Sequence, residues 1–103
     1  MVTGAASGIG RETALALARR GADLAICDVD EAGLEGTVEQ IRQIGRRVLH
    51  SRVDVSNAEQ VRGFAERTYA ELGRVDVLIN NAGIGVIGFS EALRAELAGR
   101  GLF

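Results

Sequence analysis

The sequence predicts an α/β fold built on a doubly wound parallel sheet, in three αβα layers. Two observations predict it: apolar runs of strand length alternate with segments of helical periodicity, and polar motifs directly follow those runs. Strands that alternate with helices are typical of parallel βαβ units, whose right-handed crossovers place helices on both faces of the sheet. The expected strand order is 3-2-1-4.

The first part of the chain supplies a short strand, a helix and a buried strand. Met1–Thr3 is apolar but very short, and Gly8–Arg20 has helical periodicity that Gly21 can end in a left-handed conformation. Leu24–Cys27 is an apolar run typical of a buried strand that stops at Asp28. The expected core face of this helix carries Ile9, Thr13, Ala16 and Leu17.

A second helix and a third strand follow. Asp30 can cap the helix, and Gly45 can end it. The third strand is expected within Arg46–Val53. The apolar positions of the helix recur at helical spacing and are Leu34, Val38, Ile41 and Ile44.

The last part of the chain predicts a third helix, a fourth strand and a terminal helix. Ser56 and Glu59 have the spacing of a capping box, and Gly73 ends the helix that they start. The fourth strand is expected at Val75–Ile79 and the terminal helix at Ser90–Leu97. The core-facing stripe of the third helix is Val61, Phe64, Ala65, Thr68 and Leu72.

Length and composition fit one soluble domain over residues 1–103. A net charge of −2 argues against a nucleic-acid partner, and one Cys and one His argue against a disulfide framework or a metal site. The longest uncharged run, residues 77–90, is too short and polar to cross a membrane. The expected location is cytoplasmic.

Three glycines form a G-x-x-x-G-x-G pattern between the first strand and the first helix. Gly4 permits a tight turn, Gly8 lets the backbone approach a pyrophosphate, and Gly10 lets the helix pack close to the sheet. The helix N-terminus offers free N–H groups and a positive dipole end to phosphates. A plain tight turn into a helix would use similar glycines, so the loop by itself leaves both readings open.

Asp28 ends the second strand, 18 residues after Gly10, close to the spacing of about 20 residues expected for a carboxylate that binds an adenosine ribose. Such a carboxylate repels a 2′-phosphate by roughly 4 kcal/mol at about 4 Å. No Arg lies between Arg20 and Arg42, so the loop favours NAD over NADP. The alternative is that Asp28 merely ends a strand.

Two further motifs follow the third and fourth expected strands, namely Asp54-Val55 and Asn80–Gly83. Taken with the glycine loop and Asp28, they resemble the short-chain dehydrogenase/reductase family. Thr3–Gly10 is similar to its TGxxxGxG motif, and Asn80–Gly83 is similar to its NNAG motif. The resemblance covers almost the whole chain and implies a Rossmann-like fold with NAD as its cofactor.

The resemblance also implies a role for each motif. The glycines hold the pyrophosphate, Asp28 binds the adenosine ribose, and Asp54 binds the adenine amino group beside Val55. Asn80 and its neighbours approach the nicotinamide-side ribose, and a neutral Ser7 agrees with a preference for NAD. The implied cofactor-binding residues are Gly4, Ser7, Gly8, Ile9, Gly10, Asp28, Asp54, Val55, Asn80, Ala82 and Gly83.

The chain departs from the family in its catalytic residues. The family's Tyr-x-x-x-Lys pair is absent, because the chain has no Lys and Tyr69 is followed by Leu72 and Gly73 at the third and fourth positions. Residues 1–85 resemble the family's N-terminal half, whereas residues 86–103 resemble the stretch after its Tyr-x-x-x-Lys. We therefore expect a truncated domain with an internal deletion and no catalytic residue in this chain.

The sequence thus predicts a dinucleotide-binding, catalytically incompetent relative of oxidoreductases that move a hydride between a nicotinamide and an alcohol or carbonyl. The alternative is a structural or interaction fragment that self-associates and binds no nucleotide. The apolar face of the terminal helix could pair with a second copy of the chain as a homo-oligomer. The substrate is not encoded in these residues.

Overall fold

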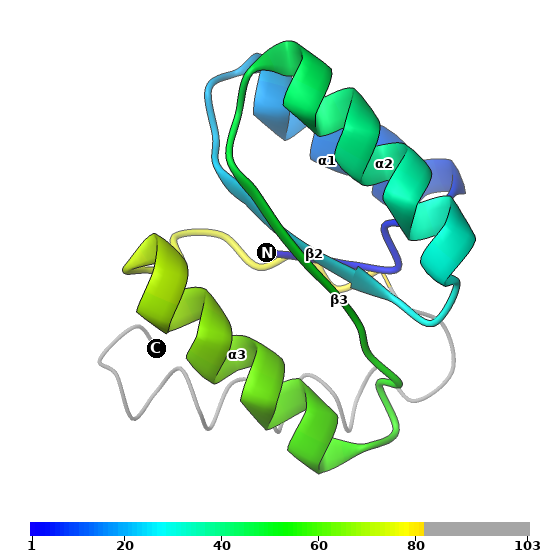
Figure 1. The fold of residues 1–103 in the computed structure, drawn as a ribbon, viewed down its shortest axis with the longest axis vertical. Helices are drawn as coiled ribbons and strands as arrows, with labels where there is room; N and C mark the ends of the chain where they lie inside the picture. Colours follow the sequence, from blue (N-terminus) through cyan, green and yellow to red (C-terminus); the bar gives the residue numbers. More distant parts are fainter. Residues whose placement is uncertain (82–103) are drawn as a thin grey trace.

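A computed structural model describes residues 1–81 of the chain. Strands and helices alternate, as the sequence predicts (Figure 1). The terminal helix expected at 90–97, and the distinction between residues 1–85 and 86–103, depend on positions outside the described residues. The elements are β1 (Val2–Thr3), α1 (Gly8–Arg19), β2 (Leu24–Asp28), α2 (Glu31–Ile44), β3 (Val48–Arg52) and α3 (Ala58–Leu72).

The three strands form one parallel sheet with β2 between β1 and β3. Val2 of β1 pairs with Ile26 of β2 and also forms a parallel bridge with Ile79, which places residue 79 on the other side of β1. The expected order 3-2-1-4 is therefore present, but the fourth strand is one bridge rather than a strand over Val75–Ile79. The reason is the length of β1, which offers only two residues for pairing.

Helices cover both faces of the sheet, with α1 and α2 on one face and α3 on the other (Figure 1). Alternate side chains of β2 enter two different cores. Leu24 and Ile26 pack in the core that α1 and α2 share, whereas Ala25 and Cys27 pack in the core under α3. The period-two alternation of a strand thus divides one apolar run between two layers, which confirms the doubly wound α/β fold.

Most helix ends follow the predicted local chemistry. The Asp30 carboxylate accepts a hydrogen bond from the Gly33 N–H, and Gly45 and Gly73 end α2 and α3 with φ of 94° and 85°. The capping box expected at Ser56 is wrong. Asn57 caps α3 by accepting from the N–H groups of residues 59 and 60, because the Ser56 N–H and hydroxyl both donate to Asp54.

The core face predicted for α1 is wrong in part: Leu17 packs against the core as expected, but Ile9 and Ala16 are exposed. The buried residues are small or lie one position away from the expected ones: Gly10, Ala14, Leu15 and Ala18. Ile9 is 76% exposed. The small residues let α1 pack closely on the sheet, and this close packing outweighs the preference of the larger Ile9 side chain for burial.

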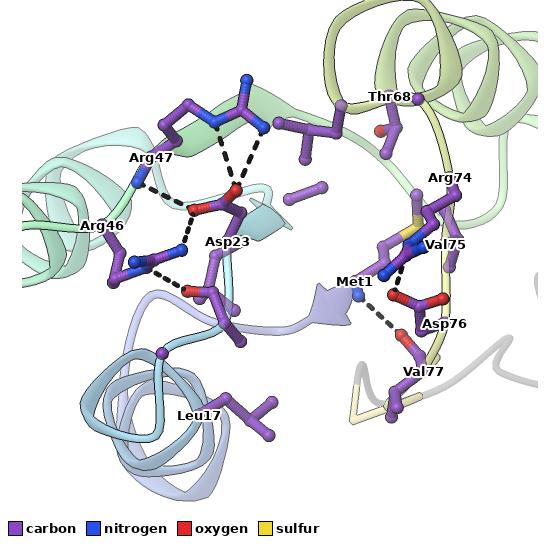
Figure 2. Close-up of a pocket in the computed structure, with 16 residues that line it drawn as sticks. Met1, Leu17, Asp23, Arg46, Arg47, Thr68, Arg74, Val75, Asp76 and Val77 are labelled. Atoms are coloured by element: carbon purple, nitrogen blue, oxygen red, sulfur yellow. Dashed lines mark hydrogen bonds and ion pairs between the residues drawn. The ribbon is translucent and has the colours of Figure 1, made fainter.

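A cavity of about 650 Å³ opens at the amino ends of the strands, between the ion pairs of Asp23 and the first residue of the chain (Figure 2). Arg46 and Arg47 both pair with Asp23, at 2.8 and 3.0 Å. The Met1 amino group donates to the Val77 carbonyl at 2.7 Å. In open parallel sheets ligands bind beyond the opposite, carboxyl ends of the strands, so the size of this cavity does not make it the ligand site.

In a polypeptide of residues 1–103, we expect burial of the Met1 amino group to make stability depend on pH. Desolvation lowers its pKa from 8.0 to about 6, although Cys27 and Asp76 act in the opposite direction. Between these values the unfolded chain binds more protons than the folded one, so the free energy of unfolding rises with pH. This lowering of the pKa corresponds to about 3 kcal/mol. Urea titrations of residues 1–103, with Met1 verified by mass, should show this rise from pH 6 to pH 8.

Nα-acetylation of Met1 provides the control, because an acetylated chain has no amino group to titrate. Its free energy of unfolding should lose this component of the pH dependence. The carboxylates whose pKa values are lowered, Asp23 and Asp54, act below about pH 4 and leave this window unaffected. A rise of equal size in the acetylated chain would contradict the assignment.

Candidate functional site

The candidate site lies at the carboxyl ends of β1, β2 and β3, where the loops to the helices meet. The loop between β1 and α1 turns at Gly4, whose φ is 66°, and enters the helix at Gly8, whose φ is 55°. Both values lie in the left-handed region that favours glycine. A Cβ at Gly8 would meet no atom within 4 Å, so the loop leaves open space at this point.

Gly10 is required for a different reason, namely close packing. A Cβ at this position would overlap the carbonyl group of Gly4 and would lie 2.7 Å from the Asn81 amide nitrogen. The Asn81 side chain donates to the same Gly4 carbonyl at 3.3 Å. The first turn of α1 therefore packs directly on the loop, as the glycine pattern predicts.

The amino end of α1 carries no side-chain cap. Ser7 occupies the capping position with extended backbone but makes no capping hydrogen bond, and the first turn contains no acidic residue. In contrast, α2 and α3 are capped by Asp30 and Asn57 and have acidic residues in their first turns. Ser7, Gly8 and Ile9 are all exposed. The N–H groups at this end of α1 are thus open to an anionic group.

Asp28 lies beside the glycine loop, as its spacing predicts. Its carboxylate accepts from the Ala6 N–H at 2.9 Å through Oδ2 and from the Asp30 N–H at 3.1 Å through Oδ1. A carboxylate offers about four lone-pair sites, so two of them remain for the hydroxyl groups of a ligand. The structure therefore brings Asp28 and the loop together at one edge of the sheet.

Asp54 and Val55 follow β3 at the same edge. The Asp54 Oδ1 accepts from the Ser56 N–H at 2.9 Å and from the Ser56 hydroxyl at 2.7 Å. These two hydrogen bonds lower the pKa of Asp54 below its usual value. The Asp54 N–H donates to the Gln60 side chain, which fixes the loop against α3. Asp54 is thus an anion with a defined orientation at neutral pH.

Asn80 and Asn81 follow the bridge at Ile79 and reach the loop from the other side of β1. The Thr3 hydroxyl donates to Asn80 Oδ1 at 3.3 Å, and the Asn81 N–H donates to the Thr3 hydroxyl at 3.0 Å. Ala82 and Gly83, the other two predicted residues of this motif, lie outside the described residues. The structure therefore joins the start of this motif to the end of β1.

Sequence reasoning missed Arg11. Its guanidinium donates to the carbonyl of Ala6 in the loop and to the carbonyl of Gly33 and the hydroxyl of Thr37 in α2. No motif points to it, because its partners are mostly backbone carbonyls. Tyr69, which lacks the Lys of a Tyr-x-x-x-Lys pair, packs against the core under α3.

The arrangement at this edge has the parts that a dinucleotide needs: an open helix N-terminus, a glycine turn, and carboxylates at the ends of two strands. Comparison with known proteins decides the family. Residues 1–100 match the short chain dehydrogenase family. The chain belongs to this family. Among residues 1–81, no cluster of side chains could hold a metal ion, and helices α1 to α3 lack the length and apolar character of a membrane span.

A curated protein and two solved structures resemble this chain. The probable oxidoreductase EphD of Mycobacterium tuberculosis is 54% identical over 87 residues, which are 84% of this chain and 15% of EphD. A carveol dehydrogenase from Mycobacterium avium in complex with NAD is 24% identical, with a TM-score of 0.87 over 97% of this chain and 49% of its own. An alcohol dehydrogenase from Thermococcus sibiricus, complexed with 5-hydroxy-NADP, is 31% identical, with a TM-score of 0.84 over 97% of this chain and 53% of its own.

The chain is shorter than these proteins. It spans about half of the two solved structures and 15% of EphD. Membership of the family and the Rossmann-like fold therefore follow from the comparisons, whereas ligand and activity are questions about this chain's own residues.

Proposed function

We propose that this short-chain dehydrogenase chain binds NAD at the carboxyl edge of its sheet and prefers it to NADP. The observation that carries the proposal is the Asp28 carboxylate, which lies within hydrogen-bond distance of the glycine loop. The uncapped end of α1 next to that loop suits a pyrophosphate, and the two lone-pair sites left on Asp28 suit the ribose hydroxyls. In a chain that also supplied a proton relay, a nicotinamide held at this edge would provide the hydride chemistry.

Each predicted binding residue has a role in this proposal. Gly4, Gly8 and Gly10 shape the turn, while Ser7 and Ile9 flank the pyrophosphate. Asp54 receives the adenine amino group, with Val55 packed beside the ring. Asn80 would contact the nicotinamide-side ribose, and Ala82 and Gly83, which lie outside the described residues, share this predicted role.

The preference for NAD rests on charge. Relatives of this chain are described with NAD in one case and with 5-hydroxy-NADP in another, so membership of the family leaves the preference open. A 2′-phosphate bound at the ribose would lie close to the Asp28 carboxylate, with Asp30 and Glu31 following in the chain. Two unit charges about 4 Å apart repel each other by roughly 4 kcal/mol at an effective dielectric constant near 20. This repulsion disfavours NADP at the ribose.

We further propose that residues 1–103 bind the nucleotide without turning over an alcohol. The sequence contains no Lys, and Tyr69 belongs to α3, where it packs against the core under that helix. A proton relay of the Tyr-x-x-x-Lys kind therefore has no residues in this chain. The test is calorimetric titration with NAD, followed by an assay for NADH with a panel of secondary alcohols. Binding without NADH supports the proposal, and NADH formation contradicts it.

The competing function is an interaction fragment that self-associates through the helix expected at residues 90–97 and binds no nucleotide. The partner in this self-association would be a second copy of the chain. Sedimentation measures self-association and calorimetry measures NAD binding. A chain that self-associates and shows no heat of NAD binding supports the interaction fragment. The open end of α1 beside a carboxylate favours the nucleotide, because such an end is suited to an anionic ligand.

A further inference from the structure

Arg11 and Asp28 belong to one closed circuit of hydrogen bonds. The Ala6 N–H donates to Asp28 Oδ2, and the Ala6 carbonyl accepts from Arg11 Nη2 at 2.6 Å. The same Nη2 donates to the Gly33 carbonyl at 2.7 Å. The Gly33 N–H donates to Asp30 Oδ1, and the Asp30 N–H donates to Asp28 Oδ1, which closes the circuit. The circuit joins the glycine loop, α1 and the start of α2.

The circuit depends on a guanidinium at position 11. Nη2 carries two hydrogens and serves both carbonyl oxygens, while Nε donates to the Thr37 hydroxyl at 2.8 Å. The hydroxyl of Thr37, which is fully buried, donates a hydrogen bond to the Ala5 carbonyl at 2.7 Å. Two consecutive carbonyls of the loop, those of Ala5 and Ala6, are therefore held against α2.

The surface of α2 is shaped to receive this contact. A Cβ at Gly33 would lie 2.8 Å from the Ala6 carbonyl oxygen, and a Cβ at Gly36 would lie 3.1 Å from Arg11 Nη2. Both glycines are inside a helix, where glycine is less favourable than alanine by about 0.8–1.0 kcal/mol. Their positions thus let the loop and the guanidinium approach the helix backbone.

We propose that Arg11 is a positioning residue for the nucleotide: it holds Ala6 so that the glycine loop and the Asp28 carboxylate keep the spacing that one ligand must bridge. This inference rests on the proposed NAD binding. Arg11 touches backbone and Thr37, and it acts on the ligand through Ala6 and Asp28. Its effect on affinity therefore depends on the carboxylate at position 28.

The test is a double-mutant cycle on the 103-residue chain with Arg11→Met, Asp28→Asn and the double variant, and NAD affinity is measured by calorimetry. We expect Arg11→Met to weaken NAD binding about tenfold when Asp28 is present and less than about threefold when it is Asn. Met has a helix propensity close to that of Arg, so α1 is preserved. Arg19→Met, on the same helix and exposed, is the matched control and should leave affinity unchanged.

A residue that only stabilises the fold would give the same factor in both backgrounds, and that result would overturn the proposal. If Arg11→Met does not fold, Arg11→Lys replaces it in the cycle. Lysine keeps the charge but not the planar fork, so we expect a loss about half as large on a logarithmic scale. Full affinity in Arg11→Lys would also overturn the proposal.

A nucleotide-free measurement separates this inference from the proposed function. Amide hydrogen exchange of Ala6, whose N–H is bonded to Asp28, should become at least tenfold faster in Arg11→Met relative to the amide of Leu24, which is bonded to the Arg47 carbonyl. A parent chain that binds neither NAD nor NADP would contradict the proposed function, and the exchange rates would still decide the positioning role. An unchanged rate of amide hydrogen exchange at Ala6 in Arg11→Met would overturn the positioning role of Arg11.

Discussion

Replacing Gly10 by Ala should destabilise the protein, although the same change normally stabilises a helix. The added Cβ would overlap the Gly4 carbonyl group and crowd the Asn81 amide at 2.7 Å. Overpacking of this kind typically costs about 1–3 kcal/mol, and the loop must move to relieve it. We expect the melting temperature to fall by at least about 5 °C and NAD binding to weaken, as measured by circular dichroism and calorimetry.

Gly63 provides a matched control for this change. It lies inside α3, and a Cβ there would meet no atom within 4 Å. Gly63→Ala should therefore raise stability by about 0.5–1 kcal/mol through helix propensity and leave NAD affinity unchanged. If both substitutions stabilise the protein, α1 does not pack on the loop as described.

Replacing Asp28 by Asn should reduce or reverse the preference for NAD. The neutral side chain loses the charged hydrogen bonds to the ribose, each of which contributes about 1.5–3 kcal/mol, so NAD affinity should fall at least about tenfold. NADP affinity should rise, because the repulsion of the 2′-phosphate disappears. Titration of each nucleotide against the parent and the variant measures the change in the ratio.

Asp30→Asn is the control for charge alone. Asn caps a helix as well as Asp does, so the hydrogen bond from the Gly33 N–H is kept while one negative charge is removed from the loop. The ratio of NAD affinity to NADP affinity should stay within about threefold of the parent. A threefold change corresponds to about 0.7 kcal/mol. An equal change of the ratio in both variants would show that general charge, and not Asp28, selects the nucleotide.

Local chemistry made much of this fold predictable from sequence. Asp30, Gly45 and Gly73 act on backbone groups a few residues away, so their roles as caps and helix ends follow from the sequence alone. The same reasoning failed at Ser56 because two side chains competed for one cap. Asp54 engaged the Ser56 donors, and Asn57 took the capping position.

Features that depend on packing between distant segments were harder to predict. Ile9 was predicted to face the core but is exposed, because the contact with Gly4 requires the small residue at position 10 there. The fourth strand was expected from its own apolar run, but its pairing depends on the two residues of β1.

The same limit applies at the candidate site. The glycines and Asp28 could be found because their spacing is itself the signal. Arg11 could not, since its partners lie 5, 22 and 26 positions away and two of them are main-chain carbonyls.

The most direct test of the central claim is thermal unfolding of the 103-residue chain, alone and with NAD or NADP. A ligand that binds only the folded state stabilises it by about 2.7 kcal/mol at a hundred times its dissociation constant. We predict a melting temperature that rises with NAD and changes little with NADP. A transition indifferent to both nucleotides would show that the glycine loop and Asp28 do not form a nucleotide site in this chain.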